Sequence, residues 1–304
     1  MSDVLVAGAI NTDLVARVTH APEAGETVTG SVFNIFGGGK GANQALAASR
    51  SGASTAILGA LGTDAFGQQR EADLRHEGVD VSAVVFRDDA PSGVTLITVE
   101  EVTGQNRIAY VPGATMTVSP GDARSAVLRL RPRCLLTTLE LPAESIAAAI
   151  TAAREIDAIV LLNATPEPEL AGRHLQNIDV LIVNDPEASA LLQRFDNSDW
   201  FRAAESLRQR GPRWVIVTIG AGGAIASFDG VHVSAAAPKV QVTDTTGAGD
   251  ALCGAFAATL AAGKTPHEAL RRGVAAGSAA CTVDGAQRSM PTAAQIDALL
   301  AASG

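Results

Sequence analysis

Short apolar runs that alternate with alanine-rich stretches constrain the fold of this chain more than any other feature. They lie at residues 4–7, 55–58, 134–139, 158–162, 180–183 and 214–219. Continuous apolar strands separated by helical segments are typical of a parallel sheet covered on both faces. The pattern therefore predicts an α/β fold with a mainly parallel central sheet.

Polar residues lie at or near the carboxyl ends of several of these runs. They are Glu140, Asn163, Asn184 and Thr218. Ligands of open α/β sheets bind at this edge. Any one of these residues could simply start a loop or cap a helix, but four together indicate a lined crevice.

Two segments depart from the alternation. Residues 15–36 and 92–111 read as strands of period-two or mixed character, and the second contains a turn at residues 103–106. They predict a small β-sheet that projects from the main body. Because the chain shows no internal repeat and no low-complexity linker, we expect residues 1–304 to form a single domain.

The charge and hydropathy of the chain argue against nucleic acids and membranes as partners. Of the 304 residues, 18% are charged, the net charge is -9, and no basic cluster offsets it, which argues against a nucleic-acid surface. No apolar stretch approaches the roughly 20 residues that span a bilayer, and the N-terminus lacks a basic region. We expect a cytoplasmic protein that binds no membrane.

The cysteines and histidines show no metal-ligand spacing. Three cysteines in apolar surroundings fit buried thiols in a reducing compartment. Cys253 lies three residues after Asp250, so a reactive thiol is an alternative.

Two glycine-rich segments carry the chemistry. Gly247, Ala248 and Gly249 precede an Ala/Leu-rich helix, where free N–H groups make a phosphate site. Asp250 follows, and a carboxylate there suits a general base better than a phosphate ligand, although it could also only stabilise the helix start. Residues 37–44 (GGGKGANQ) can wrap closely round a small polar ligand.

Residues 38–44 and 244–250 together resemble the paired signatures of the ribokinase family of carbohydrate kinases, and the resemblance runs from residues 8–13 to residues 285–287. It implies a ribokinase-like three-layer sandwich with strands of a β lid at about 15–36 and 92–111. It implies ATP-dependent phosphorylation of a small sugar, most simply the primary hydroxyl of ribose, with Mg²⁺ and a monovalent cation such as K⁺. It also implies a homodimer formed through the lid.

The resemblance assigns roles by position. Asp250 would be the general base beside an anion hole of Gly247, Ala248 and Gly249. The sugar ligands would be Asn11, Asp13, Gly39, Lys40, Asn43 and Glu140. The nucleotide side would contain Asn184, Thr218, Gly220 and Gly223, with Glu187 holding Mg²⁺ through water. The monovalent cation would lie among Asp244, Thr246, Ala280, Val283, Gly285 and Ser289. Asn43 could instead only cap its own helix.

The chain departs from the family pattern in three places: after the penultimate helix at residues 281–286, on the adenine side and in the lid. Val283 replaces an arginine, Val274 replaces a polar residue on the adenine side, and Thr95 and Thr115 lie at lid positions that bear on specificity. The alternatives are another furanose or nucleoside kinase, for deoxyribose, fructose or a pseudouridine-like nucleoside, or a non-catalytic sugar- or nucleotide-binding regulator. A Rossmann oxidoreductase would need a glycine pattern that residues 8–11 lack, and residues 263–265 only imitate the end of a P-loop.

Overall fold

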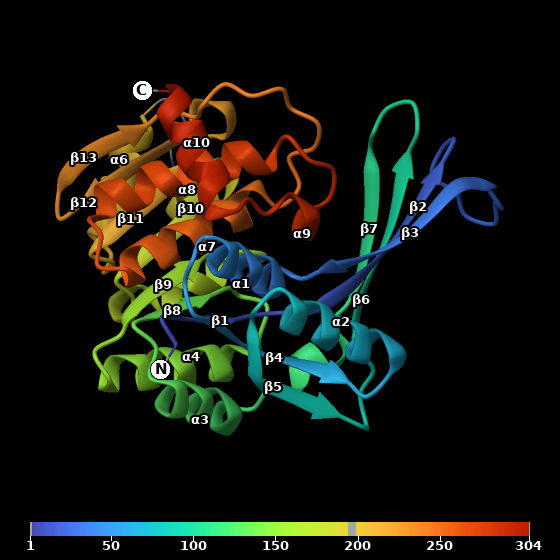
Figure 1. Ribbon diagram of the computed structural model, residues 1–304, viewed down its shortest axis with the longest axis horizontal. Helices are drawn as coiled ribbons and strands as arrows, with labels where there is room; N and C mark the ends of the chain where they lie inside the picture. The colour runs from blue at the N-terminus through green and yellow to red at the C-terminus, as the bar shows by residue number, and fades with distance from the viewer. Residues whose placement is uncertain (1, 194–198, 304) are drawn as a thin grey trace.

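A computed structural model describes residues 2–193 and 199–303. The described chain forms a nine-stranded central sheet and a separate four-stranded sheet that projects from it (Figure 1). The strands of the central sheet are, in spatial order, β13 (Val231–Ala235), β12 (Ala224–Phe228), β11 (Trp214–Thr218), β10 (Val180–Asn184), β9 (Ile159–Asn163), β8 (Cys134–Thr137), β1 (Val4–Ala7), β4 (Thr55–Gly62) and β5 (Asp80–Arg87).

The parallel part of the sheet confirms the sequence-based prediction. Strands β11 through β5 in this order are all parallel, and only the pairs β11–β12 and β12–β13 are antiparallel. The six apolar runs form six of the parallel strands. The sequence analysis missed β5, β12 and β13, which lie at or next to the sheet edges. Strands β5 and β13 are partly exposed and lack a continuous apolar run, whereas β12 is mostly buried but its apolar run is interrupted by Ser227.

Helices cover both faces of the central sheet. Helices α3 (Pro120–Leu130), α4 (Ala143–Glu155), α5 (Asp185–Leu192) and α6 (Trp200–Arg208) pack against one face. Helices α1 (Lys40–Arg50), α2 (Ala65–His76), α7 (Ala248–Ala261) and α8 (Pro266–Ala280) pack against the other. Helix α10 (Ala293–Ser303) adds to this second layer, and α9 (Ala286–Ser289) precedes it. The short 3₁₀ helices are η1 (Gly113–Thr117), η2 (Pro168–Arg173), η3 (Leu175–Asn177) and η4 (Gly220–Gly222).

The projecting sheet consists of β3 (Gly30–Gly38), β2 (Asn11–Val18), β6 (Gly93–Glu100) and β7 (Asn106–Val111), in that order (Figure 1). The β2–β6 pair is parallel, and the two outer pairs are antiparallel. Strand β2 begins at Asn11, earlier than residue 15. Asn11 and Asp13 therefore belong to the first strand of this sheet.

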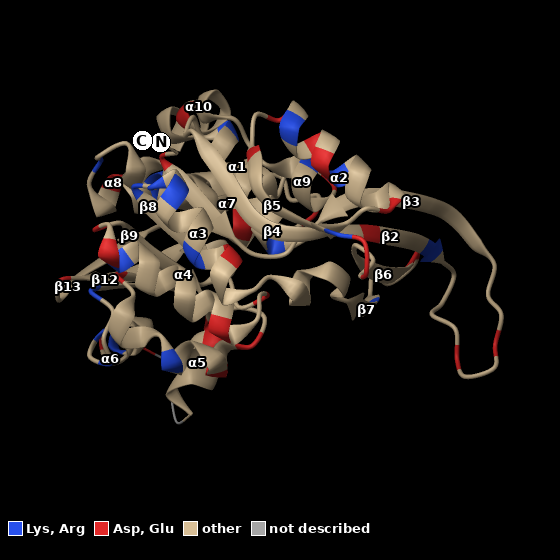
Figure 2. Cartoon of the chain, turned by 90° about the horizontal axis from the view of Figure 1, so that it is seen from below, with Lys and Arg blue, Asp and Glu red and all other residues tan. Residues whose placement is uncertain are grey.

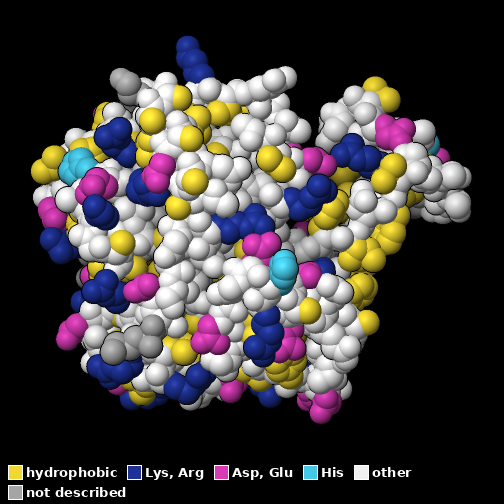
Figure 3. Space-filling view, viewed as in Figure 1, with side chains coloured by type: hydrophobic (Ala, Val, Ile, Leu, Met, Phe, Trp, Pro, Cys, Tyr) yellow, Lys and Arg dark blue, Asp and Glu magenta, His cyan; other side chains and the backbone are white. Residues whose placement is uncertain are grey.

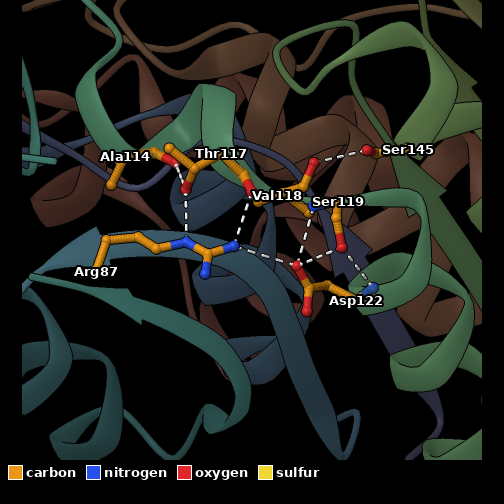
Figure 4. A network of polar contacts seen from close by, with 7 residues as sticks. All are labelled: Arg87, Ala114, Thr117, Val118, Ser119, Asp122 and Ser145. Carbon is orange, nitrogen blue, oxygen red and sulfur yellow. Dashed lines mark hydrogen bonds and ion pairs between the residues drawn. The ribbon is translucent and has the colours of Figure 1, made fainter. Parts of the chain in front are cut away.

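A network of polar contacts fixes the segment that leaves the projecting sheet (Figure 4). The Arg87 guanidinium donates to the Thr117 hydroxyl at 2.9 Å and to the Thr117 carbonyl at 2.8 Å, and it also contacts Asp122. Asp122 and Ser119 cap α3 reciprocally. Since η1 directly follows β7, this network holds Thr115 at the base of the projecting sheet.

Basic and acidic residues are interspersed over the body (Figure 2). Within residues 2–193 and 199–303, no helix is long and apolar enough to cross a membrane.

Candidate active site at the starts of two glycine-led helices

Helix α7 begins with backbone N–H groups that lack protein acceptors. Its first residue follows Gly247, which has φ 79° and provides no side-chain cap. Among the described residues, the N–H groups of Gly249 and Asp250 have no acceptor. A side chain at Gly247 would meet Met290 and Ala286, whereas a Cβ at Gly249 would meet nothing within 4 Å. The helix start therefore presents free donors to open space, as an anion site requires.

The Asp250 carboxylate is buried and held by two side-chain amides. Oδ2 accepts from Asn43 Nδ2 and Oδ1 from Gln44 Nε2, each at 2.9 Å. The Gln44 amide is itself anchored, because Nε2 also donates to Asn163 Oδ1. Burial raises the pKa of Asp250, and Lys40, Asn43 and Gln44 oppose that rise. The carboxylate is thus oriented and has the raised pKa that suits a general base.

Helix α1 also begins after a glycine, but its first backbone N–H groups have a carboxylate as acceptor. Gly39 precedes it with φ 88° and no side-chain cap. Glu140, which follows β8, accepts from Lys40 N and Gly41 N at 3.1 Å and from Ala9 N at 2.9 Å. Glu140 therefore caps α1 from a distance and joins it to the end of β1.

Lys40 lies among three carboxylates. Burial lowers its pKa, but the charges of Asp250, Glu140 and Glu187 outweigh this effect, so the pKa of Lys40 is raised. A protonated Lys40 balances negative charge in this crevice, where anionic groups would otherwise repel one another.

The base of the projecting sheet supplies a second polar cluster. Asp13, Thr95 and Tyr110 lie opposite one another on β2, β6 and β7, so their side chains share one face. Burial raises the pKa of Asp13, and Thr95 and Arg70 oppose that rise. Burial and the Glu140 charge raise the pKa of Tyr110, opposed by Asn11 and Thr115 beside its hydroxyl group.

Four buried side-chain oxygens in this region have no hydrogen-bond partner among the described residues. They are Asn11 Oδ1, Asn43 Oδ1, Gln44 Oε1 and Thr115 Oγ1. Buried polar atoms are rarely left unpaired in folded proteins. Hydroxyl groups of a ligand could donate to these oxygens.

The residues assigned to the nucleotide side lie at the ends of β10 and β11. Asn184 and Glu187 cap α5 reciprocally, with both hydrogen bonds at 2.8 Å. Burial raises the pKa of Glu187, and its contacts with Asn184, Thr165 and Lys40 oppose that rise. Thr218 ends β11, and Gly220 and Gly223 follow it with φ of 55° and 91°. A side chain at Gly223 would collide with the Ala235 carbonyl, so glycine is required for this turn.

Asp244 joins the two loops that carry the predicted cation ligands. Oδ1 accepts from Thr246 N at 2.9 Å and from its hydroxyl at 2.7 Å, and Oδ2 accepts from Gly285 N at 2.9 Å. Ala280 ends α8, and its carbonyl accepts from Val283 N, while the Ser289 hydroxyl donates to the Ala286 carbonyl. Asp244 thus brings Thr246 and Gly285 together. Among the described residues, the Ser289 hydroxyl bonds to Ala286 and not to Asp244.

The sequence analysis assigned no role to three site residues. Gln44 lies in the motif at residues 37–44, but its contact with Asp250 joins residues 206 positions apart, which the motif does not indicate. For Tyr110, the sole tyrosine of the chain, the sequence indicated only that it lies in a strand. Arg70, which is 6% exposed, donates to the Phe36 carbonyl and to Thr12 at the base of the projecting sheet. A charged residue on an amphipathic helix gives no sequence signal of such burial.

Comparisons with known proteins agree with this geometry. The sequence model of the pfkB family of carbohydrate kinases matches residues 1–293. The chain is 34% identical over 290 residues to the ribokinase of Haemophilus influenzae, covering 94% of each chain. It is 32% identical over 303 residues to the deoxyribokinase of Salmonella typhi, covering 98% of each chain. A solved structure of Arabidopsis thaliana ribokinase, complexed with ribose and ATP, superposes with a TM-score of 0.90 at 28% identity over 98% of both chains.

Proposed function

Because this chain belongs to the pfkB family of carbohydrate kinases, we propose that it transfers the γ-phosphoryl group of ATP to the primary hydroxyl of D-ribose, giving ribose 5-phosphate. The chain is an ATP-dependent sugar kinase. Ribose as the sugar is the proposed part, and it is inferred from the ribokinases that the chain resembles.

The observation that carries the proposal is the position of Asp250. Its carboxylate is held beside the free N–H groups at the start of α7. Asp250 would take the proton of the sugar hydroxyl as that oxygen attacks the γ-phosphorus. The N–H groups of the Gly247–Gly249 turn would stabilise the negative charge of the phosphoryl group in transfer, and ADP would leave.

The sugar would occupy the space between Asp250 and the base of the projecting sheet. The unpaired oxygens of Asn11 and Asn43 would accept hydrogen bonds from sugar hydroxyls. Asp13 adds a carboxylate, and Tyr110 faces the same cluster from β7. Closure of the projecting sheet over the sugar would exclude water, which otherwise competes for the phosphoryl group.

Mg²⁺ would accompany ATP, with Asn184 and Glu187 holding it through water. The donor set fits this role, because Mg²⁺ sheds its waters reluctantly and binds substrate phosphates. The bound ion supplies positive charge to the phosphates. We also propose a K⁺ site at the Asp244 loops, since Asp244 already holds Thr246 and Gly285 together.

A homodimer through the projecting sheet is supported by an exposed apolar surface on one face. Phe33, Ile35 and Leu96 are between 50% and 62% exposed, and their register places them on the same face. An apolar patch of this kind marks an interaction site. Location in the cytoplasm stays a prediction from the sequence.

The test is release of ADP across ribose, deoxyribose, fructose and nucleosides. We expect ribose to give the highest kcat/KM. A preference for deoxyribose or a nucleoside would show that the chain is a kinase of the same family with another substrate. Binding of a sugar without turnover would identify a regulator.

A further inference from the structure

A cavity of about 250 Å³ lies beside the base of the projecting sheet, apart from the crevice that holds Asp250. Its walls come from four segments: the end of β3, helices α1 and α2, and helix α9 with the glycine before it. Residues of its lining include Phe36, Leu46, Arg70, His76, Gln287 and Arg288. We name it the α1–α2 cavity. Figure 3 shows basic, acidic and histidine side chains gathered on the face where these segments meet.

The α1–α2 cavity has an excess of cationic and donor groups. Arg50 is neutralised by Glu77 at 2.7 Å, and Arg70 by Asp73 at 2.6 Å. Arg288 and His76 form no ion pair with any residue in 2–193 or 199–303. The unpaired charge of Arg288, with His76 beside the same cavity as a hydrogen-bond donor, favours an anionic ligand.

A buried donor in the cavity wall is also left unpaired. Arg70 is 6% exposed, and its two terminal nitrogens donate to the Phe36 carbonyl, Thr12 and Asp73. Its Nε has no partner among the described residues. A buried guanidinium N–H without a partner adds to the positive potential of the cavity wall. The neighbouring Leu46 and Leu74 supply an apolar wall for the rest of a small organic molecule.

The walls of the α1–α2 cavity contact both halves of the candidate active site. Arg70 binds β3 through Phe36, next to the glycines that lead into α1. On the other side, Ala286 and Met290 pack beside Gly247, at the start of α7. A ligand in the cavity would therefore bridge the base of the projecting sheet and the support of the anion hole.

We propose that the α1–α2 cavity is a second ligand site, for a small organic molecule with a carboxylate or phosphate group, and that its occupancy lowers the KM for the sugar. The oxyanion contacts the exposed side chains of Arg288 and His76, and the guanidinium of Arg70 lies in the wall of the cavity. Because β3 forms a wall of the cavity, a ligand that binds there stabilises this position of the projecting sheet, which frames the sugar site. Binding itself goes beyond the proposed function, whereas the effect on KM rests on it.

The first test is calorimetric titration with succinate and, separately, with glycerol 3-phosphate. The protein is held at saturating ribose and a non-hydrolysable ATP analogue, so that the catalytic crevice is filled. Either probe should bind, and which one binds more tightly identifies the anionic group. In the His76→Gln/Arg288→Gln variant the affinity should fall by about tenfold or more, since a charged hydrogen-bond donor is lost. Both side chains are exposed, so the variant should fold.

Arg202→Gln is the matched control, because Arg202 is exposed on α6, far from the α1–α2 cavity (Figure 1). It should bind the probe as the unmodified protein does. No binding of either probe, or equal affinity in the double variant, would overturn the site. The second test compares the sugar KM with and without the bound probe: it should fall in the unmodified protein and not in the double variant. If a probe binds but the sugar KM does not change, the site stands and its effect on sugar binding is refuted. Because the calorimetry needs no turnover, its result does not depend on whether the kinase assignment is right.

Discussion

Replacing Asp250 by asparagine should abolish most turnover while leaving the crevice intact. The change puts an NH₂ group where Asn43 Nδ2 or Gln44 Nε2 now donates. Gln44 is anchored by Asn163, but Asn43 has only this one side-chain partner, and its Oδ1 is unpaired. A flip of the Asn43 amide therefore satisfies the new donor, so the variant keeps its hydrogen bonds.

The expected loss in kcat is about 10² to 10⁴, the usual contribution of a general base. This corresponds to about 3 to 5 kcal/mol of transition-state stabilisation. In the unmodified enzyme, kcat/KM should fall toward acid pH with an apparent pKa above the ordinary 3.8 of an aspartate, because burial raises the pKa of Asp250 in the free enzyme and protonation removes the base.

The thermal stability of Asp250→Asn should not fall with its activity. Because the folded-state pKa of Asp250 is raised, its ionised form destabilises the fold, and this cost appears as the pH rises through the folded-state pKa. Asparagine carries no such cost, and Lys40 keeps Glu140 and Glu187 as counter-charges. At neutral pH the Tm of Asp250→Asn should therefore equal or exceed that of the unmodified protein.

The assay couples ADP release to a spectroscopic readout, with ribose binding followed by calorimetry. Asp88→Asn serves as control, since Asp88 is an exposed carboxylate outside the crevice. A variant that keeps turnover within about tenfold of the unmodified enzyme would refute the role of Asp250. A Tm lowered by several degrees would refute the amide flip.

Four further predictions follow from single contacts. Gly249→Val should fold normally, because an added Cβ meets no protein atom within 4 Å, but should lower kcat by about 10²-fold or more by blocking the phosphoryl group; an unchanged kcat would place the anion hole elsewhere. Tyr110→Phe should raise the sugar KM by about tenfold with little change in kcat, since it removes a hydroxyl beside Asn11; steady-state kinetics check this, and a purely kcat effect contradicts it. KCl should activate the enzyme at constant ionic strength set with tetramethylammonium chloride, and Asp244→Ala should weaken the activation, because it frees Thr246 from Gly285; a rate indifferent to K⁺ rules the site out. Leu96→Lys should convert a dimer to a monomer in light scattering, since Leu96 is 50% exposed on the apolar face; a monomeric unmodified protein would exclude the interface.

Local sequence patterns were sufficient for the strand framework and the glycine-led helix starts. A continuous apolar run such as residues 214–219 predicts a buried parallel strand because both of its faces must be covered. The glycines at 39 and 247 predict helix starts without side-chain caps, and both adopt positive φ. The edge strands β5 and β13 could not be predicted in the same way, since partial exposure gives them a mixed pattern.

The contacts that hold the site together were decided by the tertiary structure. The family resemblance predicts Glu140 as a sugar ligand, and that role stays a prediction. The tertiary structure adds that its carboxylate caps a helix 100 residues earlier in the chain. Gln44 reaches Asp250 only because α1 packs against α7. Tyr110 meets Asn11 because β6 and β7 pair beside β2. Sequence patterns describe each segment's own burial and backbone, whereas hydrogen bonds between distant segments depend on how the layers pack, and that packing sets the environment of Asp250.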